Sequence, residues 1–414
     1  MGHLYYRLKI KLDSPMSIGS GKETETDGDI ILNSNNEPYI PGTSLAGIYR
    51  SLFDKEKQET FFGYIDGEKH LQSPIIVYDG QCLNYNRGDI SNRDSVKLDE
   101  YKVAETGAKF DFQIAETGLE FVSYIELDKN HTKEMENAIE NIILPALNSG
   151  KISLGHKTTR GYGKVSVIYQ KKEFDLDTDC GLNCWLDFDM FDDNNWSTDE
   201  KDELIPKKYT TDFEIIKIPL VQKGAVSIRR YVTNAGENQP DYEQLTLKDE
   251  RPVIPGTSWA GAFRHRIAGY GVENQKINDL FGYISTNRAI KESKKSKIYF
   301  SETILLDGES KQITRNSIDR FSAGTKEGAL FTERTYYNGK TELEIRLNTN
   351  DIDILMIKLV YACVLDLCLG YLAVGGLTAV GHGMFELDKN RNITINDKEV
   401  DIREKLKGGE CTNA

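Results

Sequence analysis

The chain has 414 residues, of which 39% are hydrophobic and 28% are charged, and its formal net charge is −13. This length suffices for two ordinary domains, each with its own core, and the acidic balance argues against a surface coated with basic patches for free nucleic acid. Because no apolar run approaches the roughly 20 residues of a membrane span, and the start has no signal-peptide core, we expect a cytoplasmic protein with no membrane partner.

The first half of the chain reads, in order, as a strand, a helix, two strands and a second helix. LYYRLKIKL (4–12) alternates polar and apolar residues, which predicts a strand. A helix is expected directly after the turn IPG, over 43–53. Further strands are expected over 73–80 and 120–127, and a long helix over 133–150 runs into a glycine-rich block.

The second half has the same order. FEIIKIPLV (213–221) predicts its first strand, and 257–267 the helix after a second IPG turn. Strands are expected over 297–306 and 341–347, followed by a long helix over 353–373 and another glycine-rich block. Strand, helix, strands, helix and strand in each half predict an α+β fold of tandem ferredoxin-like (RRM-like) domains with helices on one face of the sheet.

An internal repeat supports this duplication. IPGTSLAG (40–47) and IPGTSWAG (254–261) agree at seven of eight positions at an offset of 214, and Arg50 maps onto Arg264 at the same offset. Two further pairs of blocks follow in the same order: FFGYI (61–65) with LFGYI (280–284), and LGHKTTRGYGKV (154–165) with VGGLTAVGHGMF (374–385). Three paired blocks and a paired arginine, all in one order, indicate two homologous domains.

The composition along the chain predicts where the domains begin and end. We expect a first domain over 1–170, an acidic linker over 171–212, a second domain over 213–390 and a C-terminal tail over 391–414. Residues 187–203 hold eight carboxylates and one lysine, which is typical of a solvated linker. The alternative is a segment that imitates the charge of nucleic acid.

The two IPG turns are candidate phosphate-binding sites. Proline fixes the backbone, glycine permits a sharp turn, and the unpaired amides of the following helix start attract anions. Each turn has Thr and Ser hydroxyls, which are also expected to cap the helix, then a small glycine and an arginine one turn later. The alternative is a well-capped turn that only packs on the sheet. The candidate RNA contacts are Gly42, Thr43, Ser44, Gly47, Arg50, Gly256, Thr257, Ser258, Gly261 and Arg264.

The first glycine block adds charge to this pattern. Its glycines allow close approach of a nucleic-acid backbone, and Tyr162 is available for stacking. Val380 stands in the second copy where Arg160 stands in the first, so that copy keeps the close approach without the charge. The candidate RNA contacts in the first copy are His156, Lys157, Thr158 and Arg160.

Together, the IPG turns, the FGY segments and the glycine blocks resemble the RAMP superfamily of CRISPR-associated proteins. RNSIDRFSAGTKEGALFTE (315–333), with its weaker counterpart at 95–112, is similar to the type III backbone subunits that line a guide RNA. The two copies resemble the fused, III-D-like backbone proteins. The resemblance implies RAMP domains with inserted loops and hairpins, and guide RNA (crRNA), target RNA and other CRISPR effector subunits as partners.

The resemblance also implies one catalytic aspartate per domain, on a loop shortly before the IPG turn. Asp27 and Asp241 both lie 14 residues before the turn's proline. A carboxylate there can hold Mg²⁺ or another divalent cation and assist attack by a 2′-hydroxyl, so both aspartates are candidate catalytic and metal-binding residues. Asp29 and Glu243 are the neighbouring competitors.

Two alternatives remain open at the level of sequence. One is an RNA-binding backbone module of the same assembly in which the aspartates are silent. The other is a guide-precursor processing endoribonuclease, for which His156 is the candidate general base. No HxH or HExxH arrangement, no GxSxG motif and no Walker A motif occurs in the chain.

Overall fold

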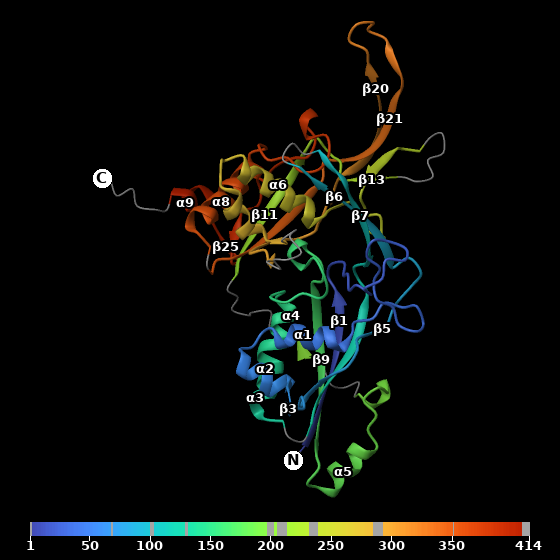
Figure 1. The fold of residues 1–414 in the computed structure, drawn as a ribbon, viewed down its shortest axis with the longest axis vertical. Helices are drawn as coiled ribbons and strands as arrows, with labels where there is room; N and C mark the ends of the chain where they lie inside the picture. Colours follow the sequence, from blue (N-terminus) through green and yellow to red (C-terminus); the bar gives the residue numbers. More distant parts are fainter. Residues whose placement is uncertain are drawn as a thin grey trace, which may run out of the picture. The chain divides into compact units, whose positions relative to one another are not determined.

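The computed structural model describes residues 2–67, 69–99, 103–128, 131–196, 203–204, 213–231, 239–284, 293–350 and 352–407. These residues divide into two compact units. The first unit is formed by the chain up to residue 204, except that 159–161 belong to the second unit together with 213–407 (Figure 1). No helix among the described residues is long and apolar enough to cross a membrane.

The first unit is built on an antiparallel sheet with the order β10-β9-β1-β8-β4. Its four main strands follow the ferredoxin-like order, with the first strand of the chain in the centre, between the last and the third. In β1, Leu8 pairs with Ser123 on one side and Tyr169 on the other. The strands are β1 (Gly2–Leu12), β4 (Ile75–Val77), β8 (Glu120–Leu127), β9 (Val165–Asp175) and β10 (Glu203–Leu204).

Helices cover one face of this sheet. Leu4, Tyr6, Leu8 and Ile10 of β1 are fully buried in a core shared with the helices, whereas the alternate residues of β1 point to the other face. The single helix expected over 133–150 is interrupted by a π-helical segment, η1. The helices are α1 (Gly42–Arg50), α2 (Lys55–Phe62), α3 (Lys133–Ala138), η1 (Ile139–Ile143) and α4 (Leu144–Asn148).

The prediction of an acidic linker over 171–212 is wrong for the first half of that range. Residues 171–175 are the end of β9, and helix α5 (Asp179–Leu186) follows within the first unit. Trp196 is 3% exposed in a cluster with Tyr5 and Tyr124 on the sheet face opposite α1–α4. The reason is that aromatic residues alternate with the carboxylates, and these rings bury enough apolar surface to hold the segment on the sheet. Residues 197–202 and 205–212 lie outside the described part of the chain.

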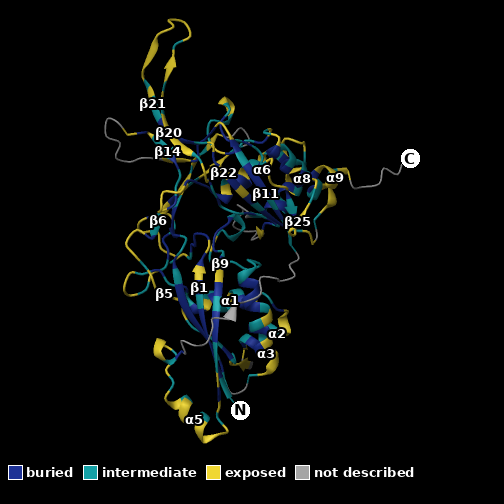
Figure 2. Cartoon of the chain, turned by 180° about the vertical axis from the view of Figure 1, so that it is seen from behind, coloured by how far each residue is buried: buried dark blue, intermediate teal, exposed yellow. Residues whose placement is uncertain are grey.

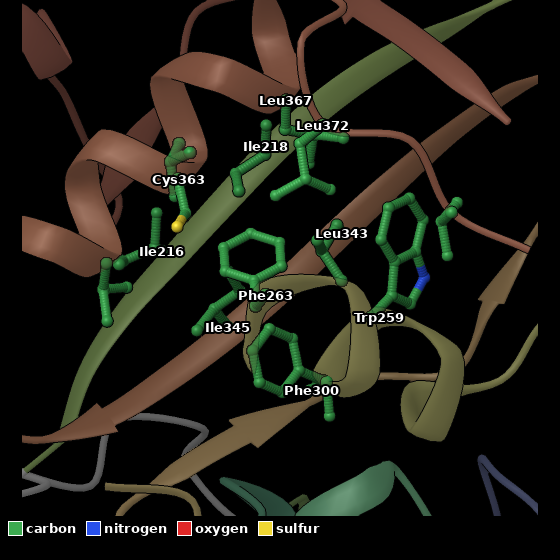
Figure 3. Close-up of a cluster of buried hydrophobic side chains, with 14 of the residues drawn as sticks. Ile216, Ile218, Trp259, Phe263, Phe300, Leu343, Ile345, Cys363, Leu367 and Leu372 are labelled. Atoms are coloured by element: carbon green, nitrogen blue, oxygen red, sulfur yellow. The ribbon is translucent and has the colours of Figure 1, made fainter. Parts of the chain in front are cut away.

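The second unit repeats this arrangement with the order β18-β22-β11, followed by β23 and β24 on the far side of β11. Trp259 and Phe263 of α6 pack with Phe300 of β18 and with Ile216 and Ile218 of β11 (Figure 3). The elements are β11 (Phe213–Lys223), β18 (Ile298–Phe300), β22 (Lys340–Asn348), β23 (Met384–Leu387), α6 (Gly256–Ala268), α7 (Asn274–Phe281) and α8 (Ile354–Cys368).

The C-terminal tail expected over 391–414 is not a separate tail up to residue 407. Strand β24 (Thr394–Ile395) pairs with β11 and with β25 (Lys398–Glu399), and α9 (Ile402–Lys407) follows. Ile393, Ile395 and Ile402 are buried in the core of the second unit. This apolar set explains why the segment stays on the sheet, so the second domain extends beyond residue 390.

Each unit also carries a long hairpin. In the first unit β6 (Ile90–Leu98) pairs with β7 (Ala104–Ala115), and in the second β20 (Glu309–Ile318) pairs with β21 (Thr325–Tyr337). The outer part of the second hairpin is exposed (Figure 2), and Phe321 near its tip is 91% exposed. These hairpins agree with the inserted hairpins that the resemblance to the RAMP superfamily implies.

The remaining elements are short. They are β2 (Tyr64–Asp66), β3 (Lys69–Leu71), β5 (Gln81–Cys82), η2 (Thr158–Arg160), η3 (Asp193–Asn195), β12 (Ala225–Val226), β13 (Arg229–Tyr231), β14 (Tyr242–Gln244), β15 (Val253–Ile254), β16 (Tyr283–Ile284), β17 (Ser293–Lys294), β19 (Thr303–Ile304) and η4 (Thr378–Val380). The strand expected over 297–306 is thus divided between β18 and β19.

Candidate nucleic-acid interface

Asp27 lies on an exposed loop against the inner end of the first hairpin. Its carboxylate Oδ2 accepts a hydrogen bond from the backbone N–H of Asp111 on β7 at 3.0 Å, and its own N–H donates to Asp111 Oδ1 at 3.1 Å. Asp27 is exposed and Asp111 is half-buried. The loop therefore places two carboxylates side by side at the surface of the first unit.

Asp241 has the equivalent position in the second unit. Its carboxylate Oδ2 accepts a hydrogen bond from the backbone N–H of Thr332 on β21 at 2.8 Å, and its own N–H donates to the carbonyl oxygen of Thr332 at 2.8 Å. In both units, then, the second strand of the hairpin holds the carboxylate of the candidate aspartate. The matched spacing of the two aspartates before the IPG turns corresponds to a matched place in the fold.

The two sites differ in the residue that faces the aspartate. Asp111 and its hairpin partner Asp94 correspond to Thr332 and Thr314 in the second unit, where the two hydroxyls lie 2.9 Å apart. The second unit thus offers one carboxylate where the first offers two. Within the described residues, no group of three or more His, Cys, Asp or Glu side chains could hold a metal ion.

Asp29, the competitor of Asp27, has a structural environment. It is 9% exposed, and its carboxylate accepts hydrogen bonds from the backbone N–H groups of Thr24, Glu25 and Thr26 and from the Thr26 hydroxyl. These bonds, led by the one from Thr24, lower the pKa of Asp29 to about 2. Because both oxygens of this carboxylate already accept hydrogen bonds within its own loop, Asp29 is poorly placed to bind a metal ion or to accept a proton from RNA.

Glu243, the competitor of Asp241, is half-buried and lies near two arginines. Its carboxylate is 3.9 Å from Arg230 Nε and 3.8 Å from Arg334 Nη1. Of these two candidates, Asp241 is the exposed one.

The IPG turns start their helices one residue earlier than expected. Helices α1 and α6 begin at Gly42 and Gly256, with Pro41 and Pro255 as N-caps and no side-chain cap. The expected capping roles of Thr43, Ser44, Thr257 and Ser258 are therefore wrong, because these residues already lie inside the first turn, where Thr43 and Thr257 are exposed and the two serines are half-buried.

The helix start in the first unit already binds an anionic group. The N–H of Gly42 donates to Asp79 Oδ1 at 2.6 Å. A phosphate at this helix start would have to displace the Asp79 carboxylate. At Gly256, a Cβ would collide with the carbonyl oxygens of Arg160 and Phe300, so this glycine serves close backbone packing.

One face of each of these helices is open. Gly47 and Gly261 are exposed, and a Cβ added to either would meet no atom within 4 Å. The close approach of an RNA backbone at these two glycines stays a prediction.

Arg50 and Arg264 both reach the FGY segment of their own unit. Arg50 Nη1 donates to the carbonyl oxygen of Gly63 at 3.3 Å. Arg264 Nη2 donates to Asn278 Oδ1 at 2.5 Å, and its guanidinium carbon lies 5.7 Å from the Phe281 ring centroid. Neither arginine forms an ion pair with a carboxylate in the described ranges, and RNA contact by Arg50 and Arg264 stays a prediction.

The two glycine loops have the same backbone path. Lys157 and Leu377, at matching positions, have φ angles of 54° and 55°. Gly163 and Gly383 have φ angles of 73° and 77°, and a Cβ on either would collide with the carbonyl oxygen at the start of its loop. Only glycine fits at these positions, which confirms that the ungapped repeat reflects a shared conformation.

The side chains of the first glycine loop are placed differently from expectation. His156 is exposed and Thr158 is half-buried, but Tyr162 is 3% exposed and packs edge-on against Phe112, so the expected stacking role of Tyr162 is wrong. Lys157 Nζ is buried, 3.0 Å from the Phe112 ring centroid and 4.7 Å from that of Phe110. Its ammonium group faces rings of the hairpin rather than the surface.

Burial lowers the pKa of Lys157 to about 7 from an ordinary value of 10.5. Since the unfolded chain binds this proton more tightly, the free energy of unfolding should rise with pH between about 7 and 10.5. Lys157→Met should remove this rise and should be more stable than the wild type below pH 7. Urea unfolding of both proteins from pH 6 to 9 measures the difference in the free energy of unfolding. If this free energy changed with pH in the same way in both proteins, the prediction would be contradicted.

Comparison with known families accounts for this arrangement. The model of the RAMP superfamily matches residues 9–166 and 216–386, which is most of both units. The chain belongs to the RAMP superfamily. Its two RAMP regions coincide with the two ferredoxin-like units, so the fold and the duplication predicted from the sequence are confirmed.

Among solved structures, the chain resembles one in a cryo-EM structure of the type III-B Cmr-beta complex bound to cognate target RNA. The identity is 15% and the TM-score is 0.33, with 44% of this chain and 60% of that chain covered. The chain thus spans under two thirds of the length of this structural relative. A search of curated protein sequences gives no match.

Arg160 of the first RAMP region is part of the second compact unit. Its Nη2 donates to the carbonyl oxygen of Phe281 at 3.2 Å, and its Nη1 donates to Thr159 O at 3.1 Å. Burial, and to a smaller extent the charge of Arg264, lower the pKa of Arg160 to about 10. Two guanidinium groups whose charges disfavour one another are suited to an anion, and RNA contact by Arg160 stays a prediction.

Sequence reasoning missed Asp111 and Gln113 of β7. Gln113 Oε1 accepts from the N–H of Ile30 and its Nε2 donates to Glu25 Oε2, so it holds the Asp27 loop on the hairpin. The alternation FDFQ (110–113) was the available signal, because it places Asp111 and Gln113 on one side of the strand and two phenylalanines on the other.

Proposed function

We propose that this RAMP protein is a backbone subunit of a type III CRISPR effector complex. It holds guide RNA through both units and cuts complementary target RNA at Asp27 and Asp241. The observation that carries the proposal is the equivalent position of the two aspartates, each exposed and each held by a backbone N–H of the second hairpin strand. A duplicated exposed carboxylate in a duplicated RNA-binding fold is the arrangement that two separate cuts would need.

A divalent cation fits the donor set of the first unit better than that of the second. Mg²⁺ is commonly held by one or two carboxylates together with phosphates of the substrate and water, rather than by a complete protein cage. Asp27 and Asp111 would hold it in the first unit, and Asp241 alone in the second. The ion would neutralise developing negative charge on the phosphate.

The residues of the chain itself position the reactants. The Asp111 and Thr332 N–H groups fix the orientation of the two catalytic carboxylates. A carboxylate oriented in this way can accept the proton of an attacking 2′-hydroxyl. Contacts by the glycine loops and helix faces would be to the RNA backbone, so guide binding should depend little on guide sequence.

The test is cleavage of a labelled complementary RNA by the assembled, guide-loaded complex, with and without EDTA. We expect two product boundaries that both disappear with EDTA. Binding of the target without any cut would favour a non-catalytic backbone module. Metal-independent cutting of a hairpin repeat RNA by the isolated chain would favour the guide-precursor nuclease instead.

A further inference from the structure

The sheet face of the first unit opposite α1–α4 has the side chains of a single-stranded RNA site. Strand β1 contributes the ring of Tyr5 and the guanidinium of Arg7, and β9 contributes the ring of Phe174 and the ammonium of Lys172. Tyr124 of β8 lies opposite Arg7 in the register. Rings that stack on bases, interleaved with cations that contact phosphates, are what single-stranded RNA binds.

Residues 179–196 cover this face by occupying the same groups. Phe188 lies 5.1 Å from Tyr5 and 4.9 Å from Phe174, between ring centroids, and Trp196 lies 6.1 Å from Tyr124. The sheet cations are occupied as well. Arg7 forms an ion pair with Asp193, and Lys172 Nζ donates to Asn195 O at 2.7 Å.

The covering segment has the composition of a nucleic-acid substitute. Residues 175–196 contain seven aspartates and no lysine or arginine, interspersed with the rings of Trp185, Phe188, Phe191 and Trp196. Its carboxylate and carbonyl groups thus meet the cations of the sheet, and its rings meet the rings of the sheet. Among the described residues, β8 places two carboxylates on this face. Glu120 lies 3.5 Å from Lys11 Nζ, and Glu126 accepts hydrogen bonds from the Tyr5 and Tyr78 hydroxyls and lies 3.4 Å from His3 Nδ1.

Few buried side chains hold residues 179–196 on the sheet. Helix α5 has no buried residue (Figure 2), and Phe191 is 60% exposed although its ring contacts Tyr78 and Tyr124. Asp193 is also mostly exposed, with 74% of its side chain accessible against 9% for Arg7. The segment can therefore leave the sheet without opening the core under the helices.

The second unit provides an internal comparison. On the corresponding face of its sheet, β11 contributes Phe213 and Lys217, and β18 contributes Tyr299. The two rings pack edge-on against each other, and Lys217 pairs with the exposed Asp397. Rings and cations thus occur on this face of both sheets, and the acidic segment 179–196 packs on that of the first.

We propose that this face of the first sheet is a second RNA-binding site, for single-stranded RNA, and that residues 179–196 occupy it as an intramolecular competitor. The site is distinct from the aspartate loops and hairpins of the proposed function. RNA that displaces the segment would stack on Tyr5, Tyr124 and Phe174 and exchange Asp193 for a phosphate at Arg7.

The test uses the full-length chain and a fluorescein-labelled 15-nucleotide oligouridine. The variant W185A/F188A/W196A removes the rings that hold the cover, and fluorescence anisotropy should give a Kd at least tenfold lower than that of the wild type. Adding Lys172→Ala to this variant should abolish the gain, whereas the matched change Lys217→Ala in the second unit should leave it. An unchanged Kd, or a gain that survives Lys172→Ala, would overturn the proposal.

A second measurement does not depend on that variant being folded. Wild-type protein is crosslinked to an oligouridine that contains 4-thiouridine, at increasing RNA concentration, and the modified peptides are identified. We expect adducts on peptides that contain Tyr5 or Tyr124, with fewer adducts in the presence of excess peptide 176–196. Adducts confined to other parts of the chain would contradict the proposal, whatever the outcome for target cleavage.

Discussion

Replacing Asp27 by Asn should remove one of the two cuts in a complementary target RNA and leave the other at its normal rate. We expect the affected cut to slow by about 100-fold or more, because the carboxylate supplies both proton transfer and cation binding at that site. Asp27 is exposed, so the change should alter the free energy of unfolding by no more than about 0.5 kcal/mol. Product boundaries on a sequencing gel measure each cut separately.

The matched change Asp241→Asn should remove the other cut, and the double variant should still bind target RNA. Glu23→Gln is the control, since Glu23 is an exposed carboxylate of the same loop as Asp27. Cutting by the double variant at the wild-type positions and rate would show that the aspartates are not catalytic.

An exchange between the units tests the role of the second carboxylate. Asp111→Thr gives the first site the residue that Thr332 provides in the second, and Thr332→Asp does the reverse. We expect Asp111→Thr to raise the Mg²⁺ concentration required for the first cut only, and Thr332→Asp to lower that for the second. Because the backbone N–H that orients the aspartate is kept in both variants, equal metal requirements before and after exchange would exclude Asp111 as a ligand.

Gly163→Ala should destabilise the first unit by about 3 kcal/mol or more. The residue has a φ of 73°, and a Cβ would collide with the carbonyl oxygen of Leu154, so both strain and overlap oppose the change. Gly47→Ala is the control in the same unit. It places a Cβ in open space on α1 and should stabilise by about 0.5–1 kcal/mol. Chemical denaturation measures both, and a similar effect of the two changes would contradict the assignment.

Gly47→Ala also tests whether RNA contacts α1, because its effects on stability and on guide binding are expected to be opposite. If an RNA backbone lies against α1, Gly47→Ala should weaken guide binding while it raises stability. Unchanged binding would leave Gly47 without a role in the interface.

The sequence predicts the sheets well because alternation encodes which side of a strand is buried. The strand expected over 120–127 has those bounds, and the core residues of β1 are the apolar ones of its alternating pattern. The π-helical segment η1 could not be predicted in this way, since residues 133–150 carry a pattern that an uninterrupted helix satisfies equally well.

The acidic segment shows a different limit. Its carboxylates predicted a solvated linker, and composition gives no weight to four aromatic residues spread among them. Whether such rings fold back depends on a complementary face elsewhere in the chain, which only the tertiary structure reveals. The candidate aspartates were found from spacing, but Asp111 was not, because the contact between residues 27 and 111 is set by the hairpin.

The two glycine loops keep the same backbone conformation although their side chains differ in charge. Their turns depend on residues without side chains, so the path of the backbone survives whatever the intervening positions carry. One copy has therefore been free to hold Arg160 and the other Val380, and one copy Lys157 and the other Leu377 at the same φ. A duplicated protein built in this way can specialise its halves by single side-chain changes, without a period in which either loop is misfolded.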